Sequence, residues 1–119
     1  MKNKLIYIED KTKASHMMNY LNKDIEINDK VYICYAVSYE RFLQNKPKEI
    51  YDNDILYDIA IKNDAHLEVC FTNNMMKSLT NQLDKFCINE LYIDNNINNS
   101  KIKKYIENKN LDIIVKTVE

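Results

Sequence analysis

Apolar positions divide the chain into alternating strand-like and helix-like segments. Short, mainly apolar runs at residues 5–8, 31–37, 67–71, 91–93 and 111–118 have the length and composition of buried β-strands. Between them, apolar residues recur at helical spacing, in the stripes Ala14, Met17, Met18, Leu21; Met76, Leu79, Leu83, Phe86; and Ile102, Tyr105, Ile106. This alternation predicts an α/β, Rossmann-like fold, in which a mostly parallel sheet carries helices on both faces. We expect one domain spanning residues 1–119.

Residues 38–64 have a weaker pattern. The segment contains the single proline, Pro47, and the apolar run 55–61, whose periodicity does not distinguish a strand from a helix. Helix starts are clearer further along the chain, where Asn73 or Asn74 and then Ser100 are the expected N-caps.

Composition changes the expected turns, because the chain contains no glycine and 17 asparagines. Asn and Asp tolerate positive φ best after glycine, so we expect such turns at the asparagine pairs 73–74, 95–96 and 98–99. A chain without glycine also cannot form a glycine-rich phosphate-binding loop. We therefore expect no dinucleotide cofactor.

Charge, the length of apolar runs and cysteine content restrict the partners and the cellular location that the chain can have. With 17 basic and 18 acidic residues the net charge is −1, so any nucleic-acid contact must depend on a local patch. No apolar run approaches the ~20 residues that cross a bilayer, which predicts a cytoplasmic protein without membrane association. The three cysteines are widely spaced among apolar residues, and we expect buried free thiols.

Acidic residues follow two of the predicted strands. Glu9 and Asp10 come directly after the first, and Asp94 ends the fourth. Ligand crevices form at the carboxyl ends of parallel strands, so Glu9 and Asp94 are candidate catalytic and metal-binding residues. The alternative is that such carboxylates cap a helix start, the role expected for Asp10. Lys11 and Lys13 are candidate phosphate contacts, or else solvent-exposed surface lysines.

The opening of the chain resembles the Toprim domain of type IA topoisomerases. Residues 5–9 match an apolar strand ending in Glu, residues 11–14 its S-P-x-K-A turn, and residues 20–24 the Y-L-G-K-D end of the helix. Residues 35–43 stand where the family has its second strand and a G-H-x-x-D-L segment. Residues 77–86 and 90–94 are similar to the helix and strand that precede D-P-D-R-E-G. The resemblance covers most of the chain except about residues 44–66.

The chain departs from the family at its acidic motif. Residues 94–99 read D-N-N-I-N-N, so Asp94 is kept, whereas Asn96 and Asn98 stand in place of the second Asp and the Glu. In the family the leading Glu and the Asp pair hold Mg²⁺ and support phosphodiester cleavage and rejoining. Mg²⁺ prefers anionic oxygen ligands, so Glu9 and Asp94 would bind it weakly at most. Asn96 and Asn98 are then candidate binding residues rather than metal ligands.

Three functions follow from these residues. The first is a standalone, catalytically inactive Toprim-like module that binds nucleic acid or a protein of DNA metabolism, in a phage, plasmid or other mobile-element setting. The second is a Mg²⁺-dependent phosphodiester-processing enzyme that uses Glu9, Asp10 and Asp94. The third is a degenerate receiver-like signalling domain, suggested by Glu9-Asp10 and Lys116, although residues 67–71 lead into Thr72-Asn73 rather than a phospho-acceptor Asp.

Overall fold

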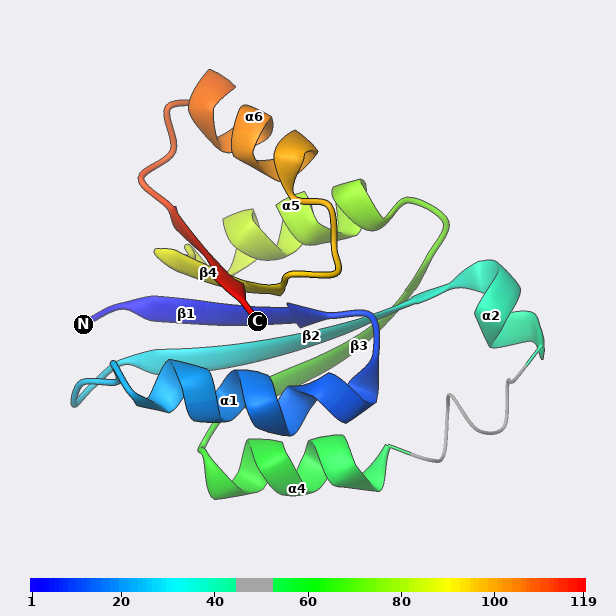
Figure 1. The fold of residues 1–119 in the computed structure, drawn as a ribbon, viewed down its shortest axis with the longest axis horizontal. Coiled ribbons are helices and arrows are strands. Elements are labelled where there is room, and N and C mark those ends of the chain that lie inside the picture. The colour runs from blue at the N-terminus through cyan, green and yellow to red at the C-terminus, as the bar shows by residue number, and fades with distance from the viewer. Residues whose placement is uncertain (45–52) are drawn as a thin grey trace.

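A computed structural model describes residues 1–44 and 53–119 of the chain (Figure 1). The described strands form one all-parallel sheet in the order β3-β2-β1-β4-β5. The strands are β1 (Asn3–Ile8), β2 (Lys30–Ser38), β3 (His66–Thr72), β4 (Glu90–Asp94) and β5 (Ile114–Val118). The helices are η1 (Lys11–Lys13, a 3₁₀ turn), α1 (Ala14–Asn22), α2 (Tyr39–Gln44), α4 (Asp54–Lys62), α5 (Met75–Lys85) and α6 (Ser100–Asn108).

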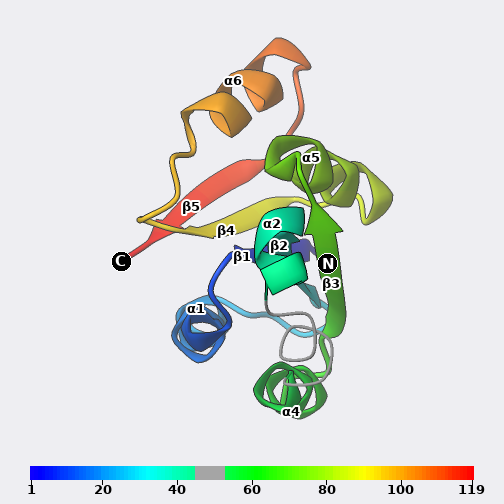
Figure 2. The ribbon, with the colours of Figure 1, turned by 90° about the vertical axis from the view of Figure 1, so that its right-hand side faces the viewer.

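Helices cover both faces of the sheet. Figure 2 shows α1 and α4 on one face and α5 and α6 on the other, with α2 following β2 at the carboxyl edge of the strands. The predicted Rossmann-like α/β fold is confirmed, because the strand order is that of the first five strands of the doubly wound 3-2-1-4-5-6 sheet. Receiver and flavodoxin-like domains have the order 2-1-3-4-5, so the topology counts against the receiver-like alternative.

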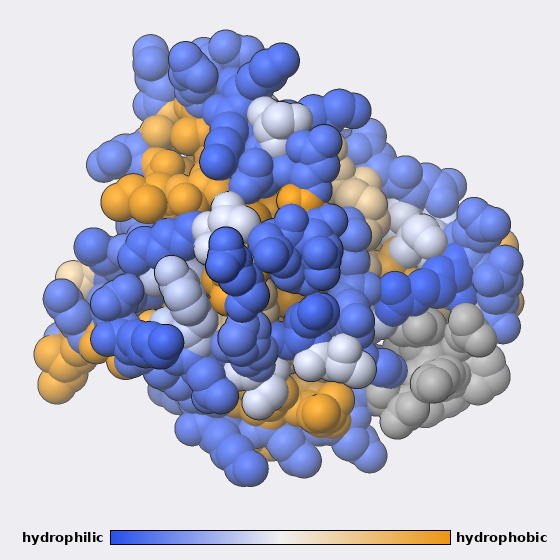
Figure 3. Space-filling model, viewed as in Figure 1, coloured by the Kyte–Doolittle hydropathy of each residue, from blue (hydrophilic) through white to orange (hydrophobic). Residues whose placement is uncertain are grey.

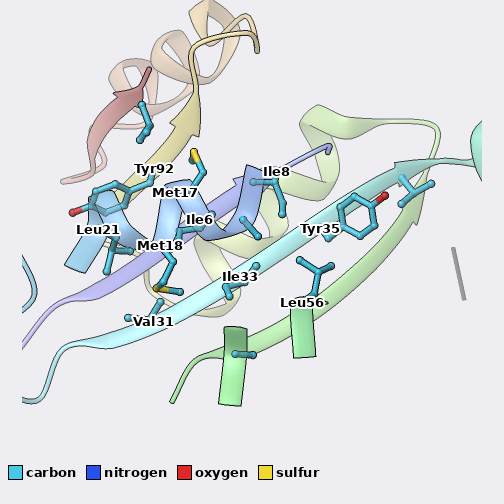
Figure 4. Close-up of a cluster of buried hydrophobic side chains, with 14 residues drawn as sticks. Ile6, Ile8, Met17, Met18, Leu21, Val31, Ile33, Tyr35, Leu56 and Tyr92 are labelled. Carbon is cyan, nitrogen blue, oxygen red and sulfur yellow. The ribbon is translucent and has the colours of Figure 1, made fainter. Parts of the chain in front are cut away.

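The two faces of the sheet carry separate cores. Side chains alternate along β1, so that Ile6 and Ile8 pack under α1 and α4, whereas Leu5 and Tyr7 pack under α5 and α6. The predicted stripe of α1 is confirmed: Ala14, Met17, Met18 and Leu21 are its buried residues. Figure 4 shows Met17, Met18 and Leu21 of this stripe against the strands. Removing such apolar side chains from water is the main favourable contribution to folding.

The ambiguous run 55–61 lies in helix α4. Leu56 and Ala60 are buried at i and i+4 spacing, which is the helical contact with the sheet. Ile55 and Ile61 are exposed on the same helix, and these outward apolar residues obscured the period in the sequence. Pro47 lies outside the described residues.

Positive φ angles occur at different positions from those expected. In the described ranges they are found at Asn28, Asp64, Cys87 and Asn110. The expected residue types are correct for three of these, but the pairs 73–74, 95–96 and 98–99 do not supply them. The reason is that Asp64, Cys87 and Asn110 follow the ends of α4, α5 and α6, where the chain must leave the helix.

Helix starts agree with the sequence in one case and differ in the other. Asn74 caps α5, because its side chain accepts a hydrogen bond from the Lys77 N–H at 2.9 Å. Ser100 is not a cap but the first residue of α6. Its N–H donates to Asn98 Oδ1 at 3.0 Å.

The cysteines are free thiols, as predicted, but they are not all buried. Cys34 is buried, Cys70 is intermediate and Cys87 is exposed. The Cys87 prediction was wrong because the residue leaves the C-terminal end of α5 in a left-handed turn.

Hydrophilic residues cover most of the face seen in Figure 3. Within the described part of the chain, no helix has the length and apolar character needed to span a bilayer.

Candidate functional site at the carboxyl edge of the sheet

A crevice of about 270 Å³ opens at the carboxyl edge of β1 and β4. We call it the switch-point crevice, because the chain leaves β1 toward β2 on one side and leaves β4 toward β5 on the other. Its lining residues are Ile8, Glu9, Asp10, Lys13, Arg41, Asp94, Asn96 and Ile97. The parallel register pairs Tyr7 with Ile93, so Glu9, directly after β1, and Asp94, the last residue of β4, lie at neighbouring strand ends and line the same crevice.

Asp10 has the capping role expected from its position. Its Oδ1 accepts hydrogen bonds from the Thr12 N–H at 3.0 Å and the Thr12 hydroxyl at 2.7 Å, at the start of η1. These two hydrogen bonds lower the pKa of Asp10. The carboxylate is therefore held as an ionised cap at the entry to α1, although it also borders the crevice.

Asp10→Ala is expected to lower the free energy of unfolding by about 1 kcal/mol, the usual loss when an N-cap acceptor is removed. Asp10→Asn keeps a side-chain acceptor and should lose less than half of that amount. Urea denaturation at neutral pH measures both variants. Equal losses in the two variants would show that the charge of Asp10, rather than its capping bond, carries the stabilisation.

Glu9 and Arg41 form the charged centre of the crevice. Partial burial raises the pKa of Glu9, and the nearby Arg41 guanidinium opposes that rise. Arg41 Nη1 donates to the Glu9 carbonyl oxygen at 2.8 Å, and Nη2 donates to the Tyr35 hydroxyl. The guanidinium also lies 5.5 Å from the centre of the Tyr35 ring. Arg41 is thus fixed beside Glu9 by the Glu9 carbonyl, directly after β1, and by the Tyr35 side chain of β2.

The two candidate asparagines, Asn96 and Asn98, border different hollows. Asn96 lines the switch-point crevice, and its N–H lies 3.4 Å from Asp94 Oδ1. Asn98 instead lines a neighbouring groove, and its side chain binds the first N–H of α6. Of these two asparagines, only Asn96 borders the crevice.

The two candidate lysines also separate. Lys13 lines the crevice and is the N-cap residue of α1. Lys11 is not part of that lining, and its Nζ lies 3.4 Å from Asn53 Oδ1. Lys13 is therefore the better placed of the two for an anion in the crevice.

In the described ranges, no three His, Cys, Asp or Glu side chains gather into a group able to hold a metal ion.

The sequence interpretation missed Arg41. The signal was available, since Arg41 follows the end of β2 by three residues and β2 neighbours β1. Applying the strand-end rule to basic as well as acidic residues would have identified it.

No protein-family model matches the chain, and a comparison with curated proteins finds no match. The function must therefore be argued from the residues of the crevice and its surroundings.

Proposed function

We propose that the chain is a catalytically inactive, Toprim-like module that binds nucleic acid at the switch-point crevice. The observation that carries the proposal is the meeting of Lys13 and Arg41 at one crevice. Phosphate oxygens are recognised by such cations. The proposal includes a protein of DNA metabolism as a second partner. It also places the protein in a mobile-element setting.

Arg41 also supports the loss of catalysis. In the Toprim family a metal ion neutralises the leading Glu and the Asp pair. Here the guanidinium lies beside Glu9, and Asn96 replaces a carboxylate at the crevice. A fixed positive charge at Glu9 reduces the attraction for Mg²⁺ and favours an anion in the crevice.

The enzyme alternative rests on one specific observation. Glu9 and Asp94 line the same crevice at the carboxyl ends of neighbouring strands. A Mg²⁺-dependent phosphodiester-processing activity would need both carboxylates to hold the metal. The response of the protein to Mg²⁺ decides between this alternative and a binding module.

We expect the chain to bind a fluorescein-labelled single-stranded oligodeoxynucleotide at about 50 mM salt, with affinity falling as salt rises. Lys13→Ala should weaken binding about 3- to 10-fold and reduce the slope of log K against log salt by about 0.7, the value for one lost phosphate contact. Fluorescence anisotropy across a salt series measures both quantities.

Lys109→Ala is the matched control, because Lys109 is exposed at the C-terminal end of α6, away from the carboxyl edge of the strands. It should leave both quantities unchanged. Equal weakening in the two variants would place the contact outside the crevice. Absence of binding at low salt would contradict the proposal and leave a protein partner as the remaining interpretation.

A further inference from the structure

A second hollow adjoins the switch-point crevice. This hollow, which we call the helix groove, has a volume of about 320 Å³ and lies between the N-terminal ends of α5 and α6. Its apolar lining comes from Met75, Met76, Leu79, Ile93 and Ile102. Glu9 and Ile97 line both hollows, so the groove and the crevice adjoin at these two residues. A volume near 300 Å³ is at the lower end for small-ligand sites and suits a single ring system.

A buried hydroxyl without a partner belongs to this groove. Tyr7 lines it, is only 2% exposed, and its hydroxyl has no hydrogen-bond partner among the described residues. Burial and the nearby Glu9 raise the pKa of Tyr7, which keeps the phenol neutral and able to donate. A buried polar group in this state costs about 1–3 kcal/mol, so the fold tolerates an orphan that a ligand acceptor would satisfy.

The rim of the groove presents further donors. The side-chain oxygens of Asn74 and Asn98 already accept the N–H groups of Lys77 and Ser100, so their amide nitrogens are the groups that remain to donate. Lys101 adds an exposed ammonium group. Glu9, at the boundary with the crevice, is the acceptor in this set.

We propose that the helix groove holds one unstacked nucleobase of a single-stranded nucleic acid whose phosphate lies in the switch-point crevice. The inference rests on the proposed function and adds the chemical class that the module recognises. A nucleobase has flat apolar faces for the methionine and isoleucine side chains, ring nitrogens and carbonyl oxygens for the Tyr7 and amide donors, and exocyclic N–H groups for Glu9.

Rotation of two methionine side chains would give a ligand access to the Tyr7 hydroxyl. Met75 and Met76 are half-buried and line the groove, and each side chain rotates about three bonds. Their rotation lets a flat ring reach the phenol, and their sulfur atoms make favourable contacts with aromatic rings. An aliphatic ligand of the same size would leave the Tyr7 hydroxyl and the amide donors unpaired.

The test compares two labelled single-stranded oligonucleotides of equal length and charge, one carrying bases and one abasic at every position. The base-bearing strand should bind the native chain between about 5- and 100-fold more tightly, the range expected for one buried base. Lys13→Ala should weaken both strands by the same factor, because both carry the same phosphates.

Tyr7→Phe isolates the hydroxyl. This variant should reduce the preference for the base-bearing strand at least about 3-fold, because the phenylalanine ring cannot donate. Its melting temperature should equal or exceed that of the native chain, because an unpaired buried hydroxyl has been removed. Tyr105→Phe is the matched control, since Tyr105 is half-buried on α6 and does not line the groove. It should leave the preference unchanged.

Three results would overturn the inference. Equal binding of the two strands, both weakened by Lys13→Ala, would remove the base site and leave the phosphate site standing. An unchanged preference in Tyr7→Phe would show that no base reaches the hydroxyl. Absence of binding by either strand would remove the proposed function and this inference together.

Discussion

Replacing Glu90 with glutamine is expected to lower the free energy of unfolding by about 3 kcal/mol or more at neutral pH. Glu90 begins β4 at the amino edge of the sheet and its side chain is only 3% exposed. Its Oε1 accepts from the Tyr92 hydroxyl at 2.8 Å and lies 3.1 Å from Lys116 Nζ, while Oε2 lies 3.0 Å from Lys2 Nζ. An amide would place an NH₂ group among these donors and remove the negative charge.

The loss is large because a second buried charge depends on Glu90. The Lys4 side chain is 2% exposed, and its Nζ lies 3.8 Å from Glu90 Oε1, 3.3 Å from Asp29 Oδ2 and 2.9 Å from the Asp24 carbonyl oxygen. Glu90→Gln removes one of the two carboxylates that compensate Lys4 and leaves Asp29 as the other, and losing a partner from a buried charge network is strongly destabilising. Urea denaturation of the native chain and Glu90→Gln at pH 7 measures the difference.

The same group predicts how stability depends on pH. Burial alone would raise the pKa of Glu90, but bonds from Lys2, Tyr92 and Lys116 and the charge of Lys4 lower it from 4.5 to about 2. The folded pKa lies below the unfolded one, so this stabilisation is present above about pH 5 and is lost as the pH falls toward 2. The shift corresponds to about 3 kcal/mol. Glu90→Gln should flatten the native pH profile by about that amount across this window.

Glu68→Gln is the matched control. Bonds from Lys85, Gln82 and His66 lower the pKa of Glu68 despite its partial burial, but its side chain is 23% exposed. Solvent screening limits such a pair to at most about 1 kcal/mol. If Glu68→Gln and Glu90→Gln lost equal stability, the buried network around Lys4 would not be the source of the effect.

Much of the fold follows from apolar spacing. The stripe of α1 and the five strands were predicted because each buries a continuous row against the sheet, so local spacing reports tertiary contact. Helix α4 was not assigned because its exposed Ile55 and Ile61 fill the outward positions where polar residues normally mark the period. Local pattern fails where apolar residues stand on both sides of a helix.

The site was predictable only in part. Glu9 and Asp94 meet at the crevice because strand ends on neighbouring parallel strands converge, a consequence of topology that the acidic strand ends already suggested. Tyr7 reads in the sequence as an ordinary core tyrosine, because its unpaired hydroxyl exists only once the surrounding side chains are in place. The sequence likewise does not show where the turn asparagines lie. Asn96 borders the crevice, whereas Asn98, two residues later in the same turn, borders the groove.

Asn96→Asp is expected to create a Mg²⁺ response that the native chain lacks. A fourth carboxylate would then line the crevice with Glu9, Asp10 and Asp94, and anionic oxygens are the ligands that Mg²⁺ prefers. Without metal the added charge joins these three carboxylates and disfavours their ionised forms, so the variant should melt below the native chain in chelator.

The size of the response follows from mass action. If the variant binds Mg²⁺ with a Kd of about 1 mM, about 10 mM metal stabilises it by roughly 1.4 kcal/mol. That free energy corresponds to a rise of about 3–6 °C in melting temperature. The native chain, with a Kd well above the metal concentration, should shift by less than about 1 °C. Thermal denaturation in chelator and in Mg²⁺ measures both shifts.

Asn95→Asp and Asn98→Glu separate the crevice from general charge effects. Asn95 is exposed and does not line the crevice, so Asn95→Asp adds the same charge one residue away and should show no Mg²⁺ response. Asn98→Glu adds a carboxylate from the groove side and should respond less than Asn96→Asp. A shift of several degrees in the native chain, lost in Asp94→Asn, would instead favour the enzyme alternative. Equal melting of Asn96→Asp in chelator and Mg²⁺ would show that positions 94 and 96 do not converge with Glu9, and the inference of a disabled metal site would then be wrong.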